Sequence, residues 1–516
     1  MASSTADAAN GTACNARVNN TPKKLVDCVT EADLWNHMVR FQAIADANPG
    51  PDGHPSRNSG EPGYKASADY VAEVMRAAGY DVRLQEYTFH YFSFVGTPVL
   101  REDAPQPQSW TVGSDFAPGQ ARGTVTAALQ PAGGIVLPPS PTPTSASGCN
   151  PADFASFAAG NIALIQRGTC APEVKVANAQ AAGASGVVIF NEGNPDRTGL
   201  VTGQVGTPTI PVVFATYAVG AHLFDEYAAT GGTGPRLTID VKGIDDPHRS
   251  DWNVIADSKG GDPDNILVVD AHLDAIYGAG MLDNASGSAA ILDIAQQLKN
   301  TNPRNKLRFI WFGGEELGLL GSQHYVDTLS AGELSTIRFA LDADVLATPN
   351  YLIGVVDPAG ANLFGRGPGT PMPAQIYGPS KVGAVYGIEY LSSIGRNHLL
   401  LSADGTDAFS FMQAGVPASG LLTGQDCCKL PTDVQLFGGV EGNFEGTIPG
   451  TDGGCVDNPF RWCDNLANND PEVLTFMSKA FASMVANLAY DTTVLNAPKA
   501  PRGKAKGAPP RGLPAT

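Results

Sequence analysis

The fold is indicated by two stretches of sequence, NILVVDAHLDAIYGAGMLDNASGSAAILDIAQQLKN at residues 265–300 and KLRFIWFGGEELGLLGSQHYVDTL at residues 306–329. The first contains an unbroken apolar run, Ile266–Val269, and the second contains the run Leu307–Phe312, which is apolar except for Arg308. Such runs are typical of strands buried on both faces of a parallel sheet. Between them, apolar residues recur at helical spacing at Ile291, Leu292, Ala295 and Leu298. Strand, helix and strand in this order predict an α/β fold with a twisted, mostly parallel sheet flanked by helices.

Polar residues that suit a metal ion follow the first of these strands. His272 lies at its carboxyl end, where ligands bind in open α/β sheets. Asp274 can accept a hydrogen bond from the ring of His272 or support the residues around it. Asp283 comes directly before the predicted helix and can point into the same crevice. Imidazole and carboxylate groups fixed on rigid elements bind divalent metals, so the sequence predicts a metal site here.

A pair of glutamates follows the second strand. Gly313-Gly314 ends that strand, so Glu315 and Glu316 emerge at its end. Adjacent side chains point in different directions, and we expect one glutamate to bind metal while the other remains free as a general base. An isolated Glu-Glu pair is more often the solvated start of a helix. The pair here occurs together with His272 and Asp283, each placed after or before a buried element, and this combination favours a metal-dependent hydrolase.

Three of these motifs resemble the secreted co-catalytic di-zinc aminopeptidases, which have the zinc exopeptidase fold. The matching stretches are HLD at 272–274, GMLDNASG at 280–287 and EELGLLGS at 315–322. A weaker match, FALDADVLATPN at 339–350, places Asp344 on a metal-ligand aspartate of the family, with Asp342 where asparagine is usual. The resemblance implies two zinc ions, bound by His272, by Asp283 as a bridge, and by Glu316 and Asp344. It also implies peptide substrates, Glu315 as general base and a supporting catalytic role for Asp274.

The resemblance breaks at the family's last metal ligand, a histidine in a cysteine-flanked loop. The corresponding stretch here is GGCVDNPFRWCDNLAN at 453–468, and no histidine follows His398. Either Asp457 takes the place of that histidine as a carboxylate ligand, or the second metal site is weak or absent. A second site made of carboxylates would select zinc less strictly and would accept manganese, magnesium or calcium more readily.

The stretch GCNPADFASFAAGNIALIQRGTCAPEVKVANAQAAGASGVVIFNE at 148–192 resembles the protease-associated domain. It predicts a strand over Ile162–Gln166, a turn at Arg167-Gly168 and a helix over Glu173–Ala182. Such a β-rich domain, inserted in the peptidase domain, would either gate substrates or bind a partner, or else shield one side of the cleft. The predicted organisation is as follows: an N-terminal arm at 1–29, the peptidase domain at 30–112 and 244–495, the insertion at 113–243, and a disordered, basic, Pro-rich tail at 496–516. Helices are expected over Glu31–Ala47 and Ala66–Ala78.

Composition and cysteine usage indicate the compartment and exclude some partners. The net charge of -18, with 33 basic residues among 516, argues against nucleic acid as a partner. No unbroken apolar run of about 18 residues suggests a membrane span. Eight cysteines, with expected pairs 14–28, 149–170 and 455–463, suggest disulfides and a secreted, extracellular protein. The adjacent Cys427 and Cys428 remain ambiguous between a vicinal disulfide, two thiols and metal ligands.

The leading hypothesis is a secreted metallo-aminopeptidase. Because the last histidine ligand is missing, a metal-depleted relative that binds peptides or a partner without turnover is an alternative. A carboxypeptidase or amidohydrolase on the same scaffold is another.

Overall fold

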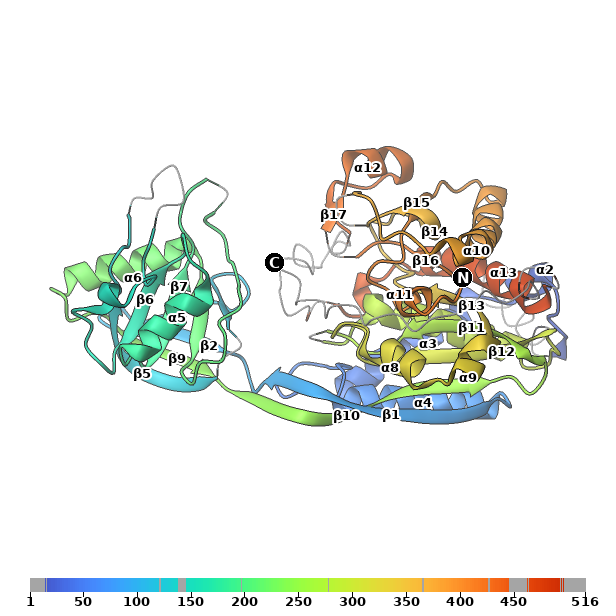
Figure 1. Cartoon of the computed structure of the whole chain (residues 1–516), viewed down its shortest axis with the longest axis horizontal. Coiled ribbons are helices and arrows are strands. Elements are labelled where there is room, and N and C mark those ends of the chain that lie inside the picture. Colours follow the sequence, from blue (N-terminus) through green and yellow to red (C-terminus); the bar gives the residue numbers. More distant parts are fainter. Residues whose placement is uncertain are drawn as a thin grey trace, which may run out of the picture.

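The computed structural model describes residues 14, 16–119, 122–137, 145–195, 197–276, 278–363, 366–425, 427–444, 462, 464–491, 493 and 495. Within these residues the chain forms two lobes, each built on an eight-stranded sheet (Figure 1). The first sheet runs, in spatial order, β1 (Asp81–Phe94), β10 (Gly243–Asp257), β12 (Asn305–Phe312), β11 (Asp262–His272), β13 (Ile337–Ala343), β16 (Ala418–Leu422), β14 (Gly354–Ala361) and β15 (Leu399–Leu401).

The centre of the first sheet is parallel, as the sequence predicts. Strands β12, β11, β13 and β16 pair in parallel, and β1, β10 and β14 add antiparallel pairs around them. Both faces are covered, because Leu267, Val269 and Ala271 of β11 pack into one apolar cluster while Ile266 and Val268 pack into the other. This is the mostly parallel α/β sheet flanked by helices that we expected.

Helices cover the two faces of this sheet. On one face lie α2 (Pro22–Val26), α3 (Glu31–Ala47), α4 (Pro62–Ala77), α7 (Ser286–Leu298), α10 (Ala374–Ser393) and α13 (Pro471–Tyr490). On the other face lie α8 (Leu320–Thr328), α9 (Ala331–Thr336) and α11 (Ala408–Gln413). The remaining elements of this lobe are η2 (Met281–Ala285), η4 (Leu466–Asn468), α12 (Pro431–Phe437), and the short strands β17 (Cys427–Lys429) and β18 (Gly442–Asn443).

Of the three predicted helices, one has the observed bounds and two differ slightly. The helix expected over Glu173–Ala182 is observed as α5 (Pro172–Ala181), one residue earlier at each end. The helix over Glu31–Ala47 has the predicted bounds, with the Thr30 hydroxyl accepting from the amide of Asp33 at its start. Helix α4 begins at Pro62, four residues before the expected start, because proline is well tolerated in the first turn, where its missing N–H would have no helical partner.

The second lobe is β-rich and corresponds to the predicted insertion. Its sheet runs β3 (Gln108–Ser109), β2 (Val99–Ala104), β9 (Arg236–Val241), β5 (Gly123–Pro131), β6 (Ile162–Gln166), β7 (Gly186–Phe190), β8 (Val212–Ala215) and β4 (Phe116–Pro118). It also contains α5 (Pro172–Ala181), α6 (Tyr217–Ala229) and η1 (Pro151–Phe154). Strands β2 and β3 precede residue 113, so the sheet reaches further toward the N-terminus than the expected start of the insertion; the boundary itself stays a prediction.

A long antiparallel ribbon joins the two lobes. Phe94 at the end of β1 pairs with Gly243 at the start of β10, and the amide of Val95 donates to Lys242 O at 2.8 Å. Figure 1 shows this ribbon running from the first sheet toward the second lobe. The chain therefore leaves the first lobe and returns to it through two adjacent strands. Such close chain ends tolerate the insertion of a domain.

Two of the expected disulfides are confirmed. Cys14–Cys28 and Cys149–Cys170 are bonded, and the described part of the chain contains no free cysteine. The expected pair 455–463 and the tail 496–516 lie outside the described residues, and so do the side chains of Cys427 and Cys428.

Helix α13 has a composition that the sequence analysis did not single out. By length and apolar content it is the one helix among the described residues that could cross a membrane. Its most apolar window is 78% buried inside the protein, and Phe481, Met484 and Val485 belong to the main apolar cluster. The apolar character of α13 is thus accounted for by burial in the core.

Candidate metal centre

The candidate site lies at the carboxyl edge of three neighbouring parallel strands. His272 is the last residue of β11, and Asp344 directly follows β13. Glu315 comes three residues after the end of β12. Because β12, β11 and β13 are adjacent and parallel, side chains that follow them meet at one edge of the sheet.

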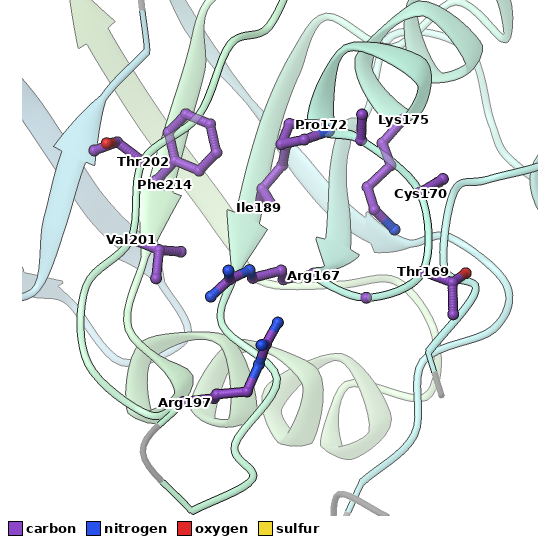
Figure 2. Close-up of a pocket in the computed structure, with 12 residues that line it drawn as sticks. Arg167, Thr169, Cys170, Pro172, Lys175, Ile189, Arg197, Val201, Thr202 and Phe214 are labelled. Carbon is purple, nitrogen blue, oxygen red and sulfur yellow. The ribbon is translucent and has the colours of Figure 1, made fainter. Parts of the chain in front are cut away.

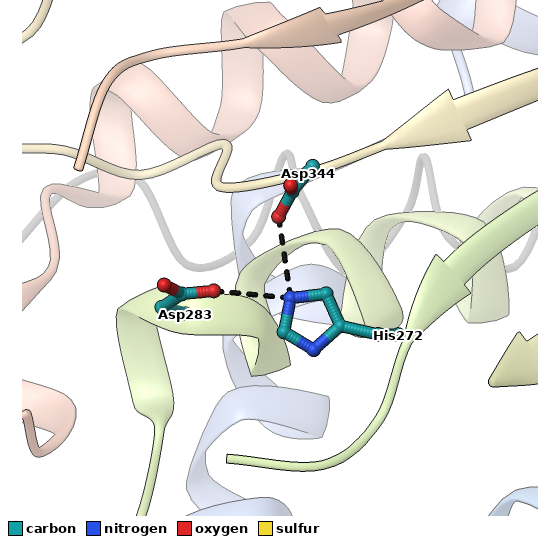
Figure 3. Close-up of side chains that lie close together, drawn as sticks. All are labelled: His272, Asp283 and Asp344. Atoms are coloured by element: carbon teal, nitrogen blue, oxygen red, sulfur yellow. Dashed lines mark hydrogen bonds and ion pairs between the residues drawn. The ribbon is translucent and has the colours of Figure 1, made fainter. Parts of the chain in front are cut away.

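His272, Asp283 and Asp344 form a compact buried group (Figure 3). The ring Nε2 of His272 lies 3.0 Å from Asp283 Oδ1 and 3.3 Å from Asp344 Oδ1. One nitrogen or oxygen atom from each residue lies within 4.8 Å of the others. The three side chains are nearly inaccessible to bulk solvent.

The spacing of these atoms suits a small divalent ion. Metal–ligand distances of 2.0–2.2 Å in a tetrahedral site place neighbouring ligand atoms about 3.4 Å apart. The two distances from His272 Nε2 are close to this value. One imidazole and two carboxylates are also ligand types that zinc uses. These residues therefore fit a metal ion without rearrangement of the strands.

The second nitrogen of His272 is held by Asp274. His272 Nδ1 lies 3.1 Å from the backbone carbonyl of Asp274 and 3.5 Å from its carboxylate. A ring N–H donated to this carbonyl leaves Nε2 with its lone pair toward Asp283 and Asp344, the tautomer that a metal requires. Asp274 was expected either to accept a hydrogen bond from the His272 ring with its carboxylate or to support the residues around it. Because the ring lies closer to the carbonyl than to the carboxylate, the geometry favours the supporting function for the side chain.

The carboxylate of Asp274 supports the glutamate pair. Its two oxygens accept hydrogen bonds from the backbone amides of Glu315 at 3.2 Å and Glu316 at 3.3 Å. One buried aspartate thus links the ends of β11 and β12 and fixes the turn that carries both glutamates.

Glu315 and Glu316 differ in their surroundings, as we expected for adjacent residues. Glu315 is buried, and its Oε1 makes no hydrogen bond to any residue that the structure describes. Glu316 is half-buried and does not belong to the compact His272 group. Burial raises the pKa of the Glu315 carboxyl well above its usual range, and the nearby Asp344 raises it further, while His272 opposes the shift.

Buried negative charge surrounds the group. Burial lowers the pKa of His272, but hydrogen bonds that its ring donates to the carboxylates of Asp274, Asp283 and Asp344 outweigh this effect and hold the pKa well above its ordinary value. Behind these residues lie three more buried aspartates, Asp270, Asp342 and Asp407. Burying several carboxylates around one imidazole is costly unless a cation compensates them, which again favours a bound metal.

Arg57 is a structural part of the site that the sequence analysis missed. It is fully buried, and its guanidinium donates to the backbone carbonyls of Ala279 (2.6 Å), Leu273 (2.7 Å) and Gly280 (2.5 Å). Burial lowers its pKa to about 10, although Asp464 and Asp274 oppose the shift. These bonds hold the segment between the metal-ligand candidates His272 and Asp283. The contacts join positions more than 200 residues apart, and no local pattern around Arg57 indicates them.

Asp464 was also missed. Its carboxylate accepts from the backbone amides of Leu282 at 2.7 Å and Asp283 at 3.1 Å. Its position directly after Cys463, in the stretch that corresponds to the family's last-ligand loop, was the available signal. The residue expected to replace the missing histidine, Asp457, lies outside the described residues.

The comparisons with known proteins agree with this geometry. The model of "Peptidase family M28" matches residues 253–484, and that of "PA domain" matches residues 131–223. An aminopeptidase of Pseudomonas aeruginosa is 35% identical over 484 residues, which cover 92% of this chain and 84% of the relative. A probable lipoprotein aminopeptidase, LpqL, of Mycobacterium tuberculosis is 32% identical and covers 79% of this chain and 76% of the relative.

A solved structure supports the fold independently. BSAP, a zinc aminopeptidase from Bacillus subtilis, superposes with a TM-score of 0.57 at 22% identity, covering 89% of this chain and 94% of that one. Sheet topology, site geometry and these matches together establish that the chain belongs to peptidase family M28 and carries a PA domain.

Proposed function

We propose that this M28 peptidase is a zinc-dependent aminopeptidase that removes residues from the amino end of peptides. The observation that carries the proposal is the buried group of His272, Asp283 and Asp344, with Glu315 directly beside it. The names of the aminopeptidases similar to this chain support both the substrate class and the metal.

His272, Asp283 and Asp344 would hold one zinc ion. The family resemblance implies that Asp283 would also contribute to holding a second ion, for which Glu316 and Asp457 would be the further ligands. When bound, zinc supplies Lewis-acid activation of the water and of the scissile carbonyl. The buried carboxylates around it favour cations over neutral occupants.

Glu315 serves as the general base. Its buried Oε1, which makes no hydrogen bond to the described residues, takes a proton from the attacking water and passes it to the leaving amine. Asp274 positions this group through the backbone amide of Glu315 and orients His272 through its carbonyl. General-base catalysis requires a carboxylate that can accept this proton and release it again.

The acidic surroundings of the site also account for the direction of attack on the peptide. A free α-amino group is cationic at neutral pH, and carboxylates at the metal edge attract it. A peptide with a blocked amino group should therefore be a poor substrate.

The test compares Glu315→Gln with Glu316→Gln, using aminoacyl amides and metal analysis. Glu315→Gln should keep its zinc but lose at least about 100-fold in kcat, because general-base contributions are of order 10² to 10⁴. Glu316→Gln should lose metal as well as activity. A Glu315→Gln variant of full activity would overturn the mechanism. If the wild-type protein binds less than one metal ion per chain and hydrolyses no substrate, it is the metal-depleted relative that only binds peptides or a partner. If it hydrolyses amino-blocked peptides as fast as peptides with a free amino group, it is a carboxypeptidase or amidohydrolase instead.

We further propose that the protein works outside the cytoplasm. The confirmed disulfides are typical of oxidising compartments, and the similar LpqL is named a probable lipoprotein. Fractionation of producing cells, with the protein detected by an antibody, tests this; recovery only in the cytoplasm would contradict it.

A further inference from the structure

The second lobe contains a cavity of about 300 Å³ away from the metal centre (Figure 2). It lies where the segments after β6 and β7 meet the beginning of α5. One side of its wall is apolar and the other is cationic. The apolar side is formed by Pro172, Ile189, Val201 and Phe214, and the cationic side by Arg167 and Arg197.

Both arginines extend into the middle of this cavity (Figure 2). Arg197 is compensated, because its guanidinium binds the buried carboxylate of Glu192 through Nε at 2.6 Å and Nη2 at 3.1 Å. Arg167 donates only to the neutral amide of Asn191, at 3.3 Å, and forms no ion pair with any described residue. Burial and the like charge of Arg197 lower the pKa of Arg167, and the negative charge of Glu192 opposes this shift. The cavity therefore has an excess of positive charge.

The start of α5 borders this cavity. The helix begins at Pro172, and its N-cap residue, Ala171, has no side chain that can accept a hydrogen bond. Both residues line the cavity. The N-terminus of a helix attracts anions through its amides and its dipole, but here Pro172 has no amide N–H and Glu173 adds a negative charge in the first turn. The positive charge of the cavity therefore comes from its cationic side chains.

The cavity is rigidly built. The disulfide Cys149–Cys170 fixes its rim. Lys175 also lines the cavity, and its buried ammonium donates to the carbonyls of Ser147 at 2.5 Å and Gln166 at 3.0 Å. A pocket shaped before a ligand arrives loses little binding energy to ordering.

We propose that this cavity binds the carboxylate end of a peptide, with Arg167 and Arg197 holding the carboxylate and the apolar wall holding the last side chain. A planar guanidinium matches a carboxylate through two parallel hydrogen bonds. Val201 and Phe214 favour an organic anion over a bare inorganic one. That the bound organic anion is a peptide rests on the proposed peptidase function. That the cavity binds an organic anion at all rests only on the residues that line it.

Calorimetric titration of the metal-loaded full-length protein with N-acetyl-leucine and with N-acetyl-leucinamide tests the proposal. Neither probe has a free amino group, so binding is measured without turnover, and an enzyme that lacks activity can still be tested. The acid should bind and the amide should not. Arg167→Gln should weaken binding of the acid about 10-fold or more, because it removes a charge-assisted hydrogen bond. The matched control, Arg236→Gln, removes an exposed arginine of the same lobe and should leave binding unchanged.

Val201→Asp provides a second variant that leaves both arginines in place. It puts a carboxylate at the cavity wall and should abolish binding of the acid even if Arg167→Gln proves unstable. Acid binding that survives both substitutions would locate the probe elsewhere, for example at the metal, and would overturn the proposal. Inorganic phosphate that competes as well as the acid, or an amide that binds equally, would also overturn it.

Discussion

Asp464 binds the backbone of Asp283: its Oδ2 accepts from the amide of Asp283 at 3.1 Å, and its Oδ1 accepts from the preceding amide of Leu282 at 2.7 Å. Asp464 belongs to the C-terminal part of the chain, whereas Asp283 precedes α7. The orientation of one metal-ligand candidate thus depends on a segment 181 residues away in sequence. Partners of this kind tune the affinity of a site without touching the ion.

Asp464→Asn should therefore weaken metal binding while the protein stays folded. The amide retains one acceptor oxygen, so one of the two backbone bonds is lost together with the charge. We expect zinc affinity to fall about 10- to 100-fold, the range typical of such supporting residues. Competition with a zinc-selective dye measures it. Asp69→Asn, which removes an exposed carboxylate paired with Lys65, should leave the affinity unchanged, and an equal loss in both variants would refute the role of Asp464.

Arg57→Lys should destabilise the protein more than an ordinary conservative change. A single ammonium cannot reach the carbonyls of Leu273, Ala279 and Gly280 in the way the guanidinium fork does. Leaving buried carbonyls without donors should lower the free energy of unfolding by on the order of 3–5 kcal/mol. Urea unfolding followed by tryptophan fluorescence measures this change. Arg76→Lys, at an exposed site on α4, should stay within about 0.5 kcal/mol of the wild type.

The parts of the molecule that could be predicted are those fixed by local patterns. The apolar run before His272 and the run before Glu315 determine two central strands, and strands that are parallel and adjacent must bring their ends together. The position of His272 at the edge of the sheet follows from this rule, and that of Asp283 from its place directly before the predicted helix, whereas Asp344 was placed in the site by family resemblance alone. The assignment of chemical roles to them came from family resemblance, and their roles stay predictions.

Arg57 and Asp464 could not be predicted, because their effect depends on contacts between distant segments. A buried arginine that donates only to carbonyls leaves no signal in its own sequence neighbourhood. The same applies to Asp270, a carboxylate inside an otherwise apolar strand. Its neighbour across the parallel pair is Asp342, and only the register of β11 and β13 reveals that the two carboxylates adjoin.

Asp293→Asn should change how stability depends on pH. Asp293 is fully buried in α7, and this burial raises the pKa of its carboxyl from 3.8 to about 8, although a hydrogen bond from Gln297 opposes the shift. A raised folded-state pKa contributes stability below pH 3.8 that is lost as the pH rises toward 8. Between these pH values the free energy of unfolding of the wild type should fall, relative to that of the variant, by up to about 1.4 kcal/mol per pH unit. Urea unfolding of both proteins at pH 5, 6 and 7 measures the difference, and parallel curves would contradict it.

The last prediction concerns Asp457, which lies outside the described residues and whose role rests on family resemblance. His272, Asp283 and Asp344 provide ligands for one ion, and a second ion needs more than Glu316. If Asp457 replaces the family's histidine, Asp457→Ala should remove one zinc ion per chain and retain the other. Asp457→His should preserve or raise zinc affinity, because imidazole is a common zinc ligand. Metal content by mass spectrometry after dialysis measures both, with Asp452→Ala in the same stretch as control. If Asp457→Ala binds as much zinc as the wild type, and its titration matches that of the control, Asp457 is not a ligand and the centre works with a single ion or with another residue at the second position.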